Sequence, residues 1–446
     1  MNRLLLSSTI VAALGGLLFG FDTAVISGTT EALRQVYQLS SSQLGFTVAS
    51  ALMGTILGSI AVGRSAERIG RRWTLMVMGV FFFVSAVGCG FAWDWFSLLL
   101  FRFIGGIAIG GASVVSPMYI AEIAPPDSRG RLVSITQFNT VLGILTAYFT
   151  NYVIAGVFSA QPGGGSGIAW RWMFGVEALP AVLFCLFLLQ IPESPRWLVK
   201  RHRRKEALDI LRRLGNRDSE SLLGEIVESL HEETVRATEP FFIRKYRTPI
   251  LLAIMVATFN QLTGINAVIY YTADIFRMAG AEQAGALFQS VIIGVTCLLS
   301  TVLAMTVIDR FGRRNLLLSG AAGMAFCLGM TAYAFYNHIG GLVVLVSLMG
   351  YIAFFAFSQG AVIWVFLSEI FPNRVRARGQ SLGCFTHWTW CAIVSWTFPV
   401  IAERSGGHAF SFFGLMMVLQ FAMVWKFLPE TKGVSLEQIQ RELAIE

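Results

Sequence analysis

The stretch Glu67-Arg68-Ile69-Gly70-Arg71-Arg72 closes an apolar segment, and it returns later as Asp309-Arg310-Phe311-Gly312-Arg313-Arg314. Two more motifs return in the same order: Glu-Ile-Ala-Pro at 122–125 as Glu-Ile-Phe-Pro at 369–372, and Pro-Glu at 192–193 as Pro-Glu at 429–430. The offset is about 240 residues each time, which indicates an internal repeat. The sequence therefore predicts two halves of the same topology, the parallel kind of repeat found in transporters.

The composition places these halves in a membrane. Hydrophobic residues make up 55% of the 446 positions and charged residues 13%, whereas a soluble domain carries about 25% charged residues. About 20 apolar residues are needed for a helix to cross the hydrocarbon core. Such segments lie at approximately 5–29, 43–63, 73–93, 97–121, 132–156, 171–191, 248–276, 284–308, 315–336, 341–368, 378–402 and 408–428. We predict an all-α membrane protein with twelve transmembrane helices.

The repeat and the spans divide the chain. We expect a six-helix half at 1–195, a polar linker at 196–247, and a second six-helix half with a short tail at 248–446. Within the linker, 206–214 and 219–232 show apolar residues at helical spacing, which predicts short amphipathic helices. Whether these helices only connect the halves or also act as a latch stays open at this point.

Basic residues predict the orientation. They cluster in the loops after even-numbered spans, at Arg64, Arg68, Arg71, Arg72, Arg129, Arg131, throughout 196–213, and at Arg310, Arg313, Arg314, Arg374, Arg376 and Arg378. The opposite loops offer only Arg34, Arg171, Arg277 and Arg404. By the positive-inside rule both termini are cytoplasmic, in a multi-pass protein of a bacterial-type cytoplasmic membrane. The net charge of +8 reflects this asymmetry, so no nucleic-acid partner is predicted.

The sequence shows none of the residue patterns that are typical of catalytic or metal sites. The six cysteines (Cys89, Cys185, Cys297, Cys327, Cys384 and Cys391) all fall in predicted spans and lack metal-ligand spacing. There is no nucleophile–base set and no phosphate-binding loop. We therefore predict no enzyme, no catalytic residue, no metal and no cofactor.

Five motifs carry a resemblance to a known family. They are Gly-Gly-Leu-Leu-Phe-Gly-Phe-Asp at 15–22, Arg-x-Gly-Arg-Arg at 68–72, Pro-Glu-Ser-Pro-Arg-Trp-Leu at 192–198, Gln-Leu-Thr-Gly-Ile-Asn at 261–266 and Pro-Glu-Thr-Lys-Gly at 429–433. Together they resemble the sugar porter family of the major facilitator superfamily, over about residues 9–437. The resemblance implies the major facilitator fold, monosaccharide transport, and alternating access, in which the two halves rock about a central site.

Charged residues of the repeated motifs are candidates for gating. In both halves the repeated motifs place acidic residues close to basic ones, which predicts ion-pair networks at the ends of neighbouring helices. Networks of this kind, if formed in one conformation only, bias a two-state equilibrium. The candidates are Arg71, Glu122, Arg129, Glu193, Arg196, Asp309, Arg313, Glu369 and Arg376, and the resemblance adds Tyr270 and Tyr271 as an extracellular gate. The alternatives are that the arginines only set topology and that the tyrosines belong to an aromatic belt.

Amides and aromatic residues inside the spans are candidates for sugar binding. A sugar hydroxyl donates and accepts, as an amide does, and an aromatic face suits the C–H side of the ring. The resemblance places Gln137, Gln261, Asn266 and Trp364 at sugar-contacting positions, and we add Phe19, Asn260, His387 and Trp388. For any single amide the alternative is a hydrogen bond between helices, worth about 0.6 kcal/mol.

Four departures from the family pattern leave the particular sugar open. Asn260 stands where many relatives have Gln, and Cys297 stands where relatives carry a sugar-contacting Asn. His387 replaces an Asn or Gln. Ala361 occupies the place of a Gly-Pro pair that breaks span ten, so we expect that helix to bend less sharply.

Asp22 in span one is the candidate for proton coupling. An ionised Asp inside a span costs about 3 kcal/mol, so it needs a partner or a proton. Arg102 in span four is expected to be the only other strongly ionisable residue buried at that depth in the first half. The resemblance is to the proton-coupled members of the family, which have Asp and Arg at the positions that match Asp22 and Arg102. Passive members have Asn at the first of these positions. A purely structural ion pair is the alternative.

The predicted function is proton-coupled monosaccharide symport. Its partners are a hexose or pentose, a proton and the lipid bilayer, and the protein is expected to be a monomer. A facilitative sugar uniporter is the first alternative. A non-transporting sugar sensor is a remote one, because such a sensor is expected to carry long cytoplasmic tails.

Overall fold

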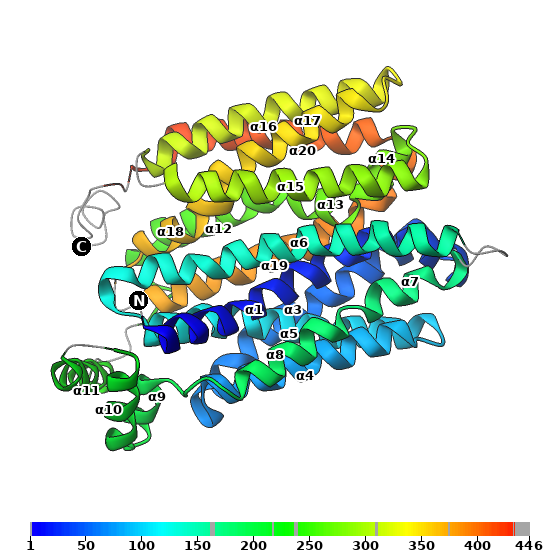
Figure 1. Cartoon of the computed structure of the whole chain (residues 1–446). Coiled ribbons are helices and arrows are strands. Elements are labelled where there is room, and N and C mark those ends of the chain that lie inside the picture. Colours follow the sequence, from blue (N-terminus) through cyan, green and yellow to red (C-terminus); the bar gives the residue numbers. More distant parts are fainter. Residues whose placement is uncertain are drawn as a thin grey trace. The chain divides into compact units, whose positions relative to one another are not determined.

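The computed structural model describes residues 2–160, 166–215, 218–235, 240–307, 311–372 and 375–430 together with Lys432. All regular elements within these ranges are helices (Figure 1). Asp309, one of the predicted gating residues, lies outside the described residues.

The predicted spans are helices. Eleven stretches of the described residues are long and apolar enough to cross a membrane. They are α1 with η1 (Arg3–Gly28), α3 (Ser41–Ile69), α4 (Arg71–Gly90), α5 (Trp95–Ile123), α6 (Arg129–Ser159), α7 with α8 (Gly167–Leu188), η3 with α12 and α13 (Arg244–Tyr270), Gln283–Thr306 of α15 (Gln283–Val307), α16 (Arg313–Tyr336), α17 with α18 (Leu342–Leu367) and α20 (Gly406–Phe427). The remaining predicted span, 378–402, is α19 (Arg376–Arg404), whose 29 residues suffice in length. The prediction of an all-α membrane protein with twelve spans is confirmed.

The helices pack into two compact units. Unit 1 comprises Met1–Val25, Ser50–Ala147 and Ile168–Ala237, and unit 2 comprises Ile26–Ala49, Tyr148–Gly167 and Thr238–Glu446. Unit 2 thus includes α2 (Thr30–Tyr37) and the adjoining ends of α3 and α6. The predicted boundaries at 195 and 247 stay a prediction, because the units group residues by packing and not by order in the chain.

Glycines bring the helices of unit 1 into close contact. A Cβ atom on Gly20 of α1 would lie 1.8 Å from the backbone oxygen of Thr140 in α6. A Cβ atom on Gly106 of α5 would lie 1.9 Å from the backbone oxygen of Ala51 in α3. Small residues at such crossings allow the backbone-to-backbone approach typical of membrane helices.

The linker folds onto unit 1. It forms α9 (Pro195–Lys200), α10 (Arg204–Arg213) and α11 (Ser219–Val235), which confirms the two predicted amphipathic helices. The indole nitrogen of Trp197 donates to the backbone oxygen of Glu67 (2.9 Å), and the Lys200 ammonium pairs with the Glu67 carboxylate (2.7 Å). These two contacts attach the linker to the end of α3, while the buried apolar face of α10 joins the hydrophobic core of unit 1.

Two spans of unit 2 are interrupted. The seventh divides into α12 (Arg247–Leu262), α13 (Ile265–Tyr270) and α14 (Thr272–Met278), with Gly264 at φ +84° between the first two. The tenth divides into α17 (Leu342–Phe357) and α18 (Gln359–Glu369) at Ser358. The tenth helix is therefore interrupted although position 361 is alanine; whether it bends less sharply than in relatives stays a prediction. Interrupted helices expose backbone and side-chain polar groups inside a membrane protein, where sites are built.

Candidate functional site

Charged motifs of unit 1 meet at the linker end of the helices. The Arg71 guanidinium binds both oxygens of Glu122, at 2.8 and 2.9 Å, and Glu122 also accepts a hydrogen bond from Ser194. The Glu193 carboxylate accepts from the backbone N–H groups of Arg71 (2.9 Å) and Arg72 (3.2 Å), at the N-terminus of α4, where a negative charge is favourable. Burial raises the pKa of the Glu193 carboxyl, although these backbone donors lower it.

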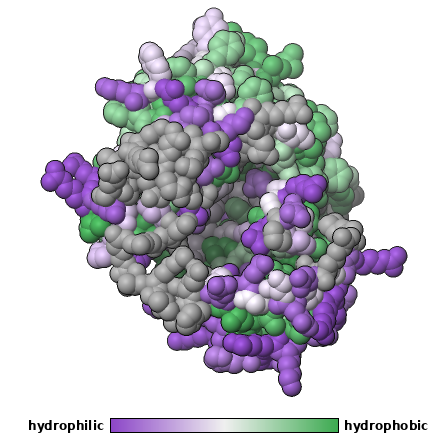
Figure 2. Space-filling model, turned by 90° about the vertical axis from the view of Figure 1, so that its left-hand side faces the viewer, coloured by the Kyte–Doolittle hydropathy of each residue, from purple (hydrophilic) through white to green (hydrophobic). Residues whose placement is uncertain are grey.

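Unit 2 repeats this arrangement. The Glu430 carboxylate accepts from the backbone N–H groups of Arg313 (2.9 Å) and Arg314 (3.2 Å) at the N-terminus of α16. The Arg313 side chain pairs with Glu369 at 3.3 Å. The repeat read from the sequence is thus also a repeat of contacts. Figure 2 faces the side on which the linker helices α9, α10 and α11 are seen in Figure 1, and hydrophilic side chains gather on that face.

Other predicted gating residues play smaller parts in these contacts. Arg129 is exposed and forms no ion pair with any described residue. Arg376 donates to the backbone oxygen of Phe371 at 3.4 Å. Arg196 is half-buried in α9. A gating role for all of these residues stays a prediction.

A buried charged cluster lies in unit 1. Asp22 on α1 and Arg102 on α5 form an ion pair, and both are 1% exposed. Glu177, between α7 (Ser166–Gly175) and α8 (Ala178–Leu188), is 2% exposed, and its charge interacts with both. The guanidinium of Arg102 also lies over the ring of Phe174.

The expectation that Arg102 is the only other buried ionisable residue of the first half is wrong. Glu177 lies near the start of the predicted span 171–191, and an acidic residue near the end of a span is expected at the membrane–water interface. The packing of α8 against α1 and α4 buries it. An acid within an otherwise apolar stretch was the signal in the sequence.

Amides of unit 2 form a connected chain at the interruption of span seven. The Asn266 Nδ2 donates to Gln261 Oε1 (2.9 Å), and Gln261 Nε2 donates to Asn260 Oδ1 (3.3 Å) and to the His387 ring (3.0 Å to Nε2). The Asn260 Nδ2 donates in turn to Gln359, at 3.3 Å to the backbone oxygen and 3.4 Å to Oε1. The structure therefore brings together three predicted sugar-binding amides and His387.

Aromatic rings border this chain. The ring of His387 on α19 lies 5.1 Å from the rings of Trp364 on α18 and Trp388 on α19. Trp364 is 40% exposed, whereas Trp388 is buried. An exposed indole next to hydrogen-bonding amides is the combination that a sugar ring requires.

Gln359 was missed by the sequence reading. Its side chain is fully buried at the start of α18, next to the interruption at Ser358. An amide beside a glycine in an otherwise apolar span was the available signal. Only the packing of span ten against span seven shows that Gln359 contacts Asn260.

Two predicted sugar-binding residues belong to unit 1. Gln137 is exposed on α6, and Phe19 is half-buried on α1. Their membership of the sugar site stays a prediction.

The two predicted gating tyrosines of unit 2 are buried. The hydroxyl of Tyr271 donates to the backbone oxygen of Ser395 in α19 (2.9 Å), and its ring stacks on Phe398 at 5.3 Å. Tyr270 is buried on α13. Tyr271 thus fastens the start of α14 to α19.

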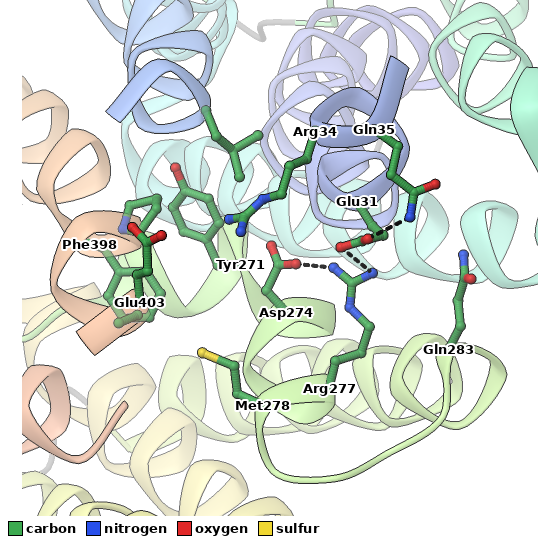
Figure 3. A pocket seen from close by; sticks show the side chains of 13 residues that line it. Glu31, Arg34, Gln35, Tyr271, Asp274, Arg277, Met278, Gln283, Phe398 and Glu403 are labelled. Atoms are coloured by element: carbon green, nitrogen blue, oxygen red, sulfur yellow. Dashed lines mark hydrogen bonds and ion pairs between the residues drawn. The ribbon is translucent and has the colours of Figure 1, made fainter. Parts of the chain in front are cut away.

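Tyr271 also borders a charged cavity of about 640 Å³ within unit 2 (Figure 3). Its charged lining residues are Glu31, Arg34, Asp274, Arg277 and Glu403. Figure 3 shows Arg277 between Glu31 and Asp274, with which it pairs. No sequence motif pointed to this cluster, because its members come from segments far apart in the chain.

Comparisons with known proteins agree with this geometry. The family model described as "Sugar (and other) transporter" matches residues 8–443. The chain is 41% identical to the D-xylose-proton symporter of Escherichia coli K12, covering 97% of this chain and 94% of that protein. It is 37% identical to the arabinose-proton symporter of Bacillus subtilis, covering 96% and 93%.

Solved structures are similar over nearly the whole chain. The inward-open xylose transporter of Escherichia coli matches with a TM-score of 0.88 at 39% identity, covering 98% of this chain and 99% of that one. The same symporter bound to 6-bromo-6-deoxy-D-glucose matches with a TM-score of 0.80 at 39% identity, covering 99% and 100%.

Proposed function

The chain belongs to the sugar transporter family of the major facilitator superfamily, and from this premise we propose that it is a proton-coupled monosaccharide symporter working by alternating access. The buried ion pair of Asp22 and Arg102 is the observation that carries the proton coupling. A carboxylate in a dry site is stabilised by its cation or by a proton, so the two compete for it.

The proposed cycle uses this competition. When the site faces outward, Asp22 takes a proton and releases Arg102, which favours sugar binding and closure. When the site faces inward, the sugar leaves, Arg102 pairs with Asp22 again and the proton departs. Glu177 supports the scheme because it is buried close enough to Asp22 and Arg102 to interact electrostatically with both.

The sugar is proposed to bind at the amide chain and the adjoining indole. Gln261, Asn266 and His387 supply hydrogen bonds, Trp364 supplies the aromatic face, and Asn260 and Trp388 support them. Gln137 and Phe19 of unit 1 are proposed as further sugar-binding residues. The sugar class follows the relatives, whose names give xylose and arabinose as cargo.

The proposed setting is a bacterial-type inner membrane, in which the chain is a monomer with both termini in the cytoplasm. The basic linker and the basic motif loops support this orientation through the positive-inside rule. The paired acids and arginines of both units are then proposed to gate the cytoplasmic side, and Tyr270 and Tyr271 the opposite side.

The test uses purified protein in liposomes. Uptake of D-xylose, L-arabinose and D-glucose, with alkalinisation of the external medium, identifies the sugar and the coupling. Asp22→Asn should abolish accumulation against a gradient while keeping counterflow. Accumulation by Asp22→Asn would contradict the proton role, and wild-type uptake without alkalinisation would favour a uniporter.

A further inference from the structure

The hydrogen bonds around Gln359 run in one direction. Asn266 donates to Gln261, Gln261 donates to Asn260, and Asn260 donates to Gln359. A primary amide donates only through nitrogen and accepts only through oxygen. The orientation of each amide in the chain is therefore set by the next one, and the chain ends at the oxygen atoms of Gln359.

We propose that Gln359 is a positioning residue for sugar selection: as the last acceptor of this chain it fixes which atom of the Asn266 amide faces the sugar. The inference rests on the sugar site proposed above. Gln359 reaches Asn260 with both its side-chain oxygen and its backbone oxygen, from the interruption between α17 and α18. Two acceptors on one donor group leave Asn260 a single orientation.

The consequence for the site is specific. Asn266 uses Nδ2 toward Gln261, which leaves Oδ1 as an acceptor for a sugar hydroxyl. Both ring nitrogens of His387 lie within hydrogen-bond distance of Gln261 Nε2, at 3.2 Å for Nδ1 and 3.0 Å for Nε2, so the ring presents this edge to the amide chain. The site thus selects a sugar whose hydroxyl donates to Asn266 Oδ1.

The buried environment supports this assignment. Gln359 is 0% exposed, and its Nε2 has no hydrogen-bond partner among the described residues. Burying an amide whose N–H donors have no partner costs free energy, which a hydrogen bond accepted by its carbonyl oxygen offsets in part. Its oxygen is needed here, because Asn260 is also fully buried and has its donor group directed at Gln359.

Another buried amide of unit 2 supplies a matched control. Gln420 on α20 is also 0% exposed, and neither its nitrogen nor its oxygen has a hydrogen-bond partner among the described residues. Gln420→Met therefore removes a buried amide without cutting the chain, whereas Gln359→Met removes the side-chain acceptor at its end.

The experiment measures inhibition of uptake by monodeoxy and monofluoro forms of the transported sugar at each ring position. Fluorine accepts but cannot donate, so at the hydroxyl that contacts Asn266 the fluoro form should inhibit the wild type as poorly as the deoxy form. Gln359→Met leaves Asn260 only the backbone oxygen of residue 359, so the amides turn over more readily. The fluoro form should then recover up to about tenfold relative to the deoxy form, with a higher KM for the natural sugar. Gln420→Met should keep the wild-type pattern.

A second variant keeps the test decisive if Gln359→Met does not fold. Asn260→Leu removes the preceding amide from the series of hydrogen bonds. It should raise inhibition by the fluoro form relative to the deoxy form in the same way. An unchanged ratio in whichever variant folds overturns the inference. If Gln261→Leu and Asn266→Ala keep wild-type affinity, the proposed sugar site itself is wrong; if they lose affinity and the ratio is unchanged, only the role of Gln359 is wrong.

Discussion

Glu31 and Arg277 form an ion pair of 3.3 Å that joins α2, from the first half of the sequence, to α14, from the second half. The same guanidinium also pairs with Asp274 on its own helix. The side chains of Glu31 and Arg277 are 38% and 20% exposed, so the pair is partly screened by solvent.

We expect this pair to help close the outer end of the transporter. Glu31→Gln and Arg277→Gln should each raise the outward-open population, and the external KM for sugar should fall two- to fivefold, which corresponds to about 0.5–1 kcal/mol for a partly exposed pair. In a double-mutant cycle the two changes should not add. Additive effects would show that the pair has no role in closure. Glu206→Gln is the control, because it removes an exposed pair with Arg203 on the linker.

The buried cluster of unit 1 predicts unequal effects on folding. Arg102→Gln leaves Asp22 and Glu177 buried without a cation and should lower stability by about 3–5 kcal/mol. Asp22→Asn should cost less, because Glu177 still interacts with Arg102. Acidification should restore part of the stability of Arg102→Gln, since buried acids lose their charge on protonation. Melting temperatures in detergent at several pH values test this; equal losses for the two variants would argue against a shared cluster.

The repeated motif offers a comparison of two glycines. A Cβ atom on Gly70 would lie 2.3 Å from the Glu193 carboxylate, and one on Gly312 would lie 2.1 Å from the Glu430 carboxylate. Only Gly70 has a positive φ, of 96°, whereas Gly312 has −67°. Gly70→Ala should therefore destabilise the protein by about 1–3 kcal/mol more than Gly312→Ala, as measured by thermal unfolding. The reverse order would mean that displacement of the carboxylate, and not backbone strain, dominates.

Gly264 sets the interruption of span seven from which the amide chain projects. Its φ is +84°, and a Cβ atom there would lie 2.4 Å from the ring of Phe413. Gly264→Ala should shift Gln261 and Asn266 and reduce sugar uptake more than tenfold, while the protein still reaches the membrane. Gly280→Ala is the control, because Gly280 has a φ of +93° with nothing within 4 Å. Equal losses in both variants would assign the effect to backbone strain alone.

The sequence by itself determined the membrane class, the twelve spans and the two-fold repeat. These features depend on local composition and on motifs whose residues are contiguous, so no knowledge of packing was needed. It also identified Asp22 with Arg102, and Gln261 with Asn266 and His387, because a polar side chain in an apolar span is conspicuous wherever it lies.

The tertiary structure alone decided which of these polar groups meet. From its position near the end of a predicted span, Glu177 is expected at the membrane–water interface. In the structure, the packing of α8 against α1 buries it near Arg102. Gln359 and Asn260 are about a hundred residues apart, and Glu31 and Arg277 are farther still, so no local pattern relates them. Directional hydrogen bonds and ion pairs depend on where separate helices cross, and that is a property of the packed fold and not of any single segment.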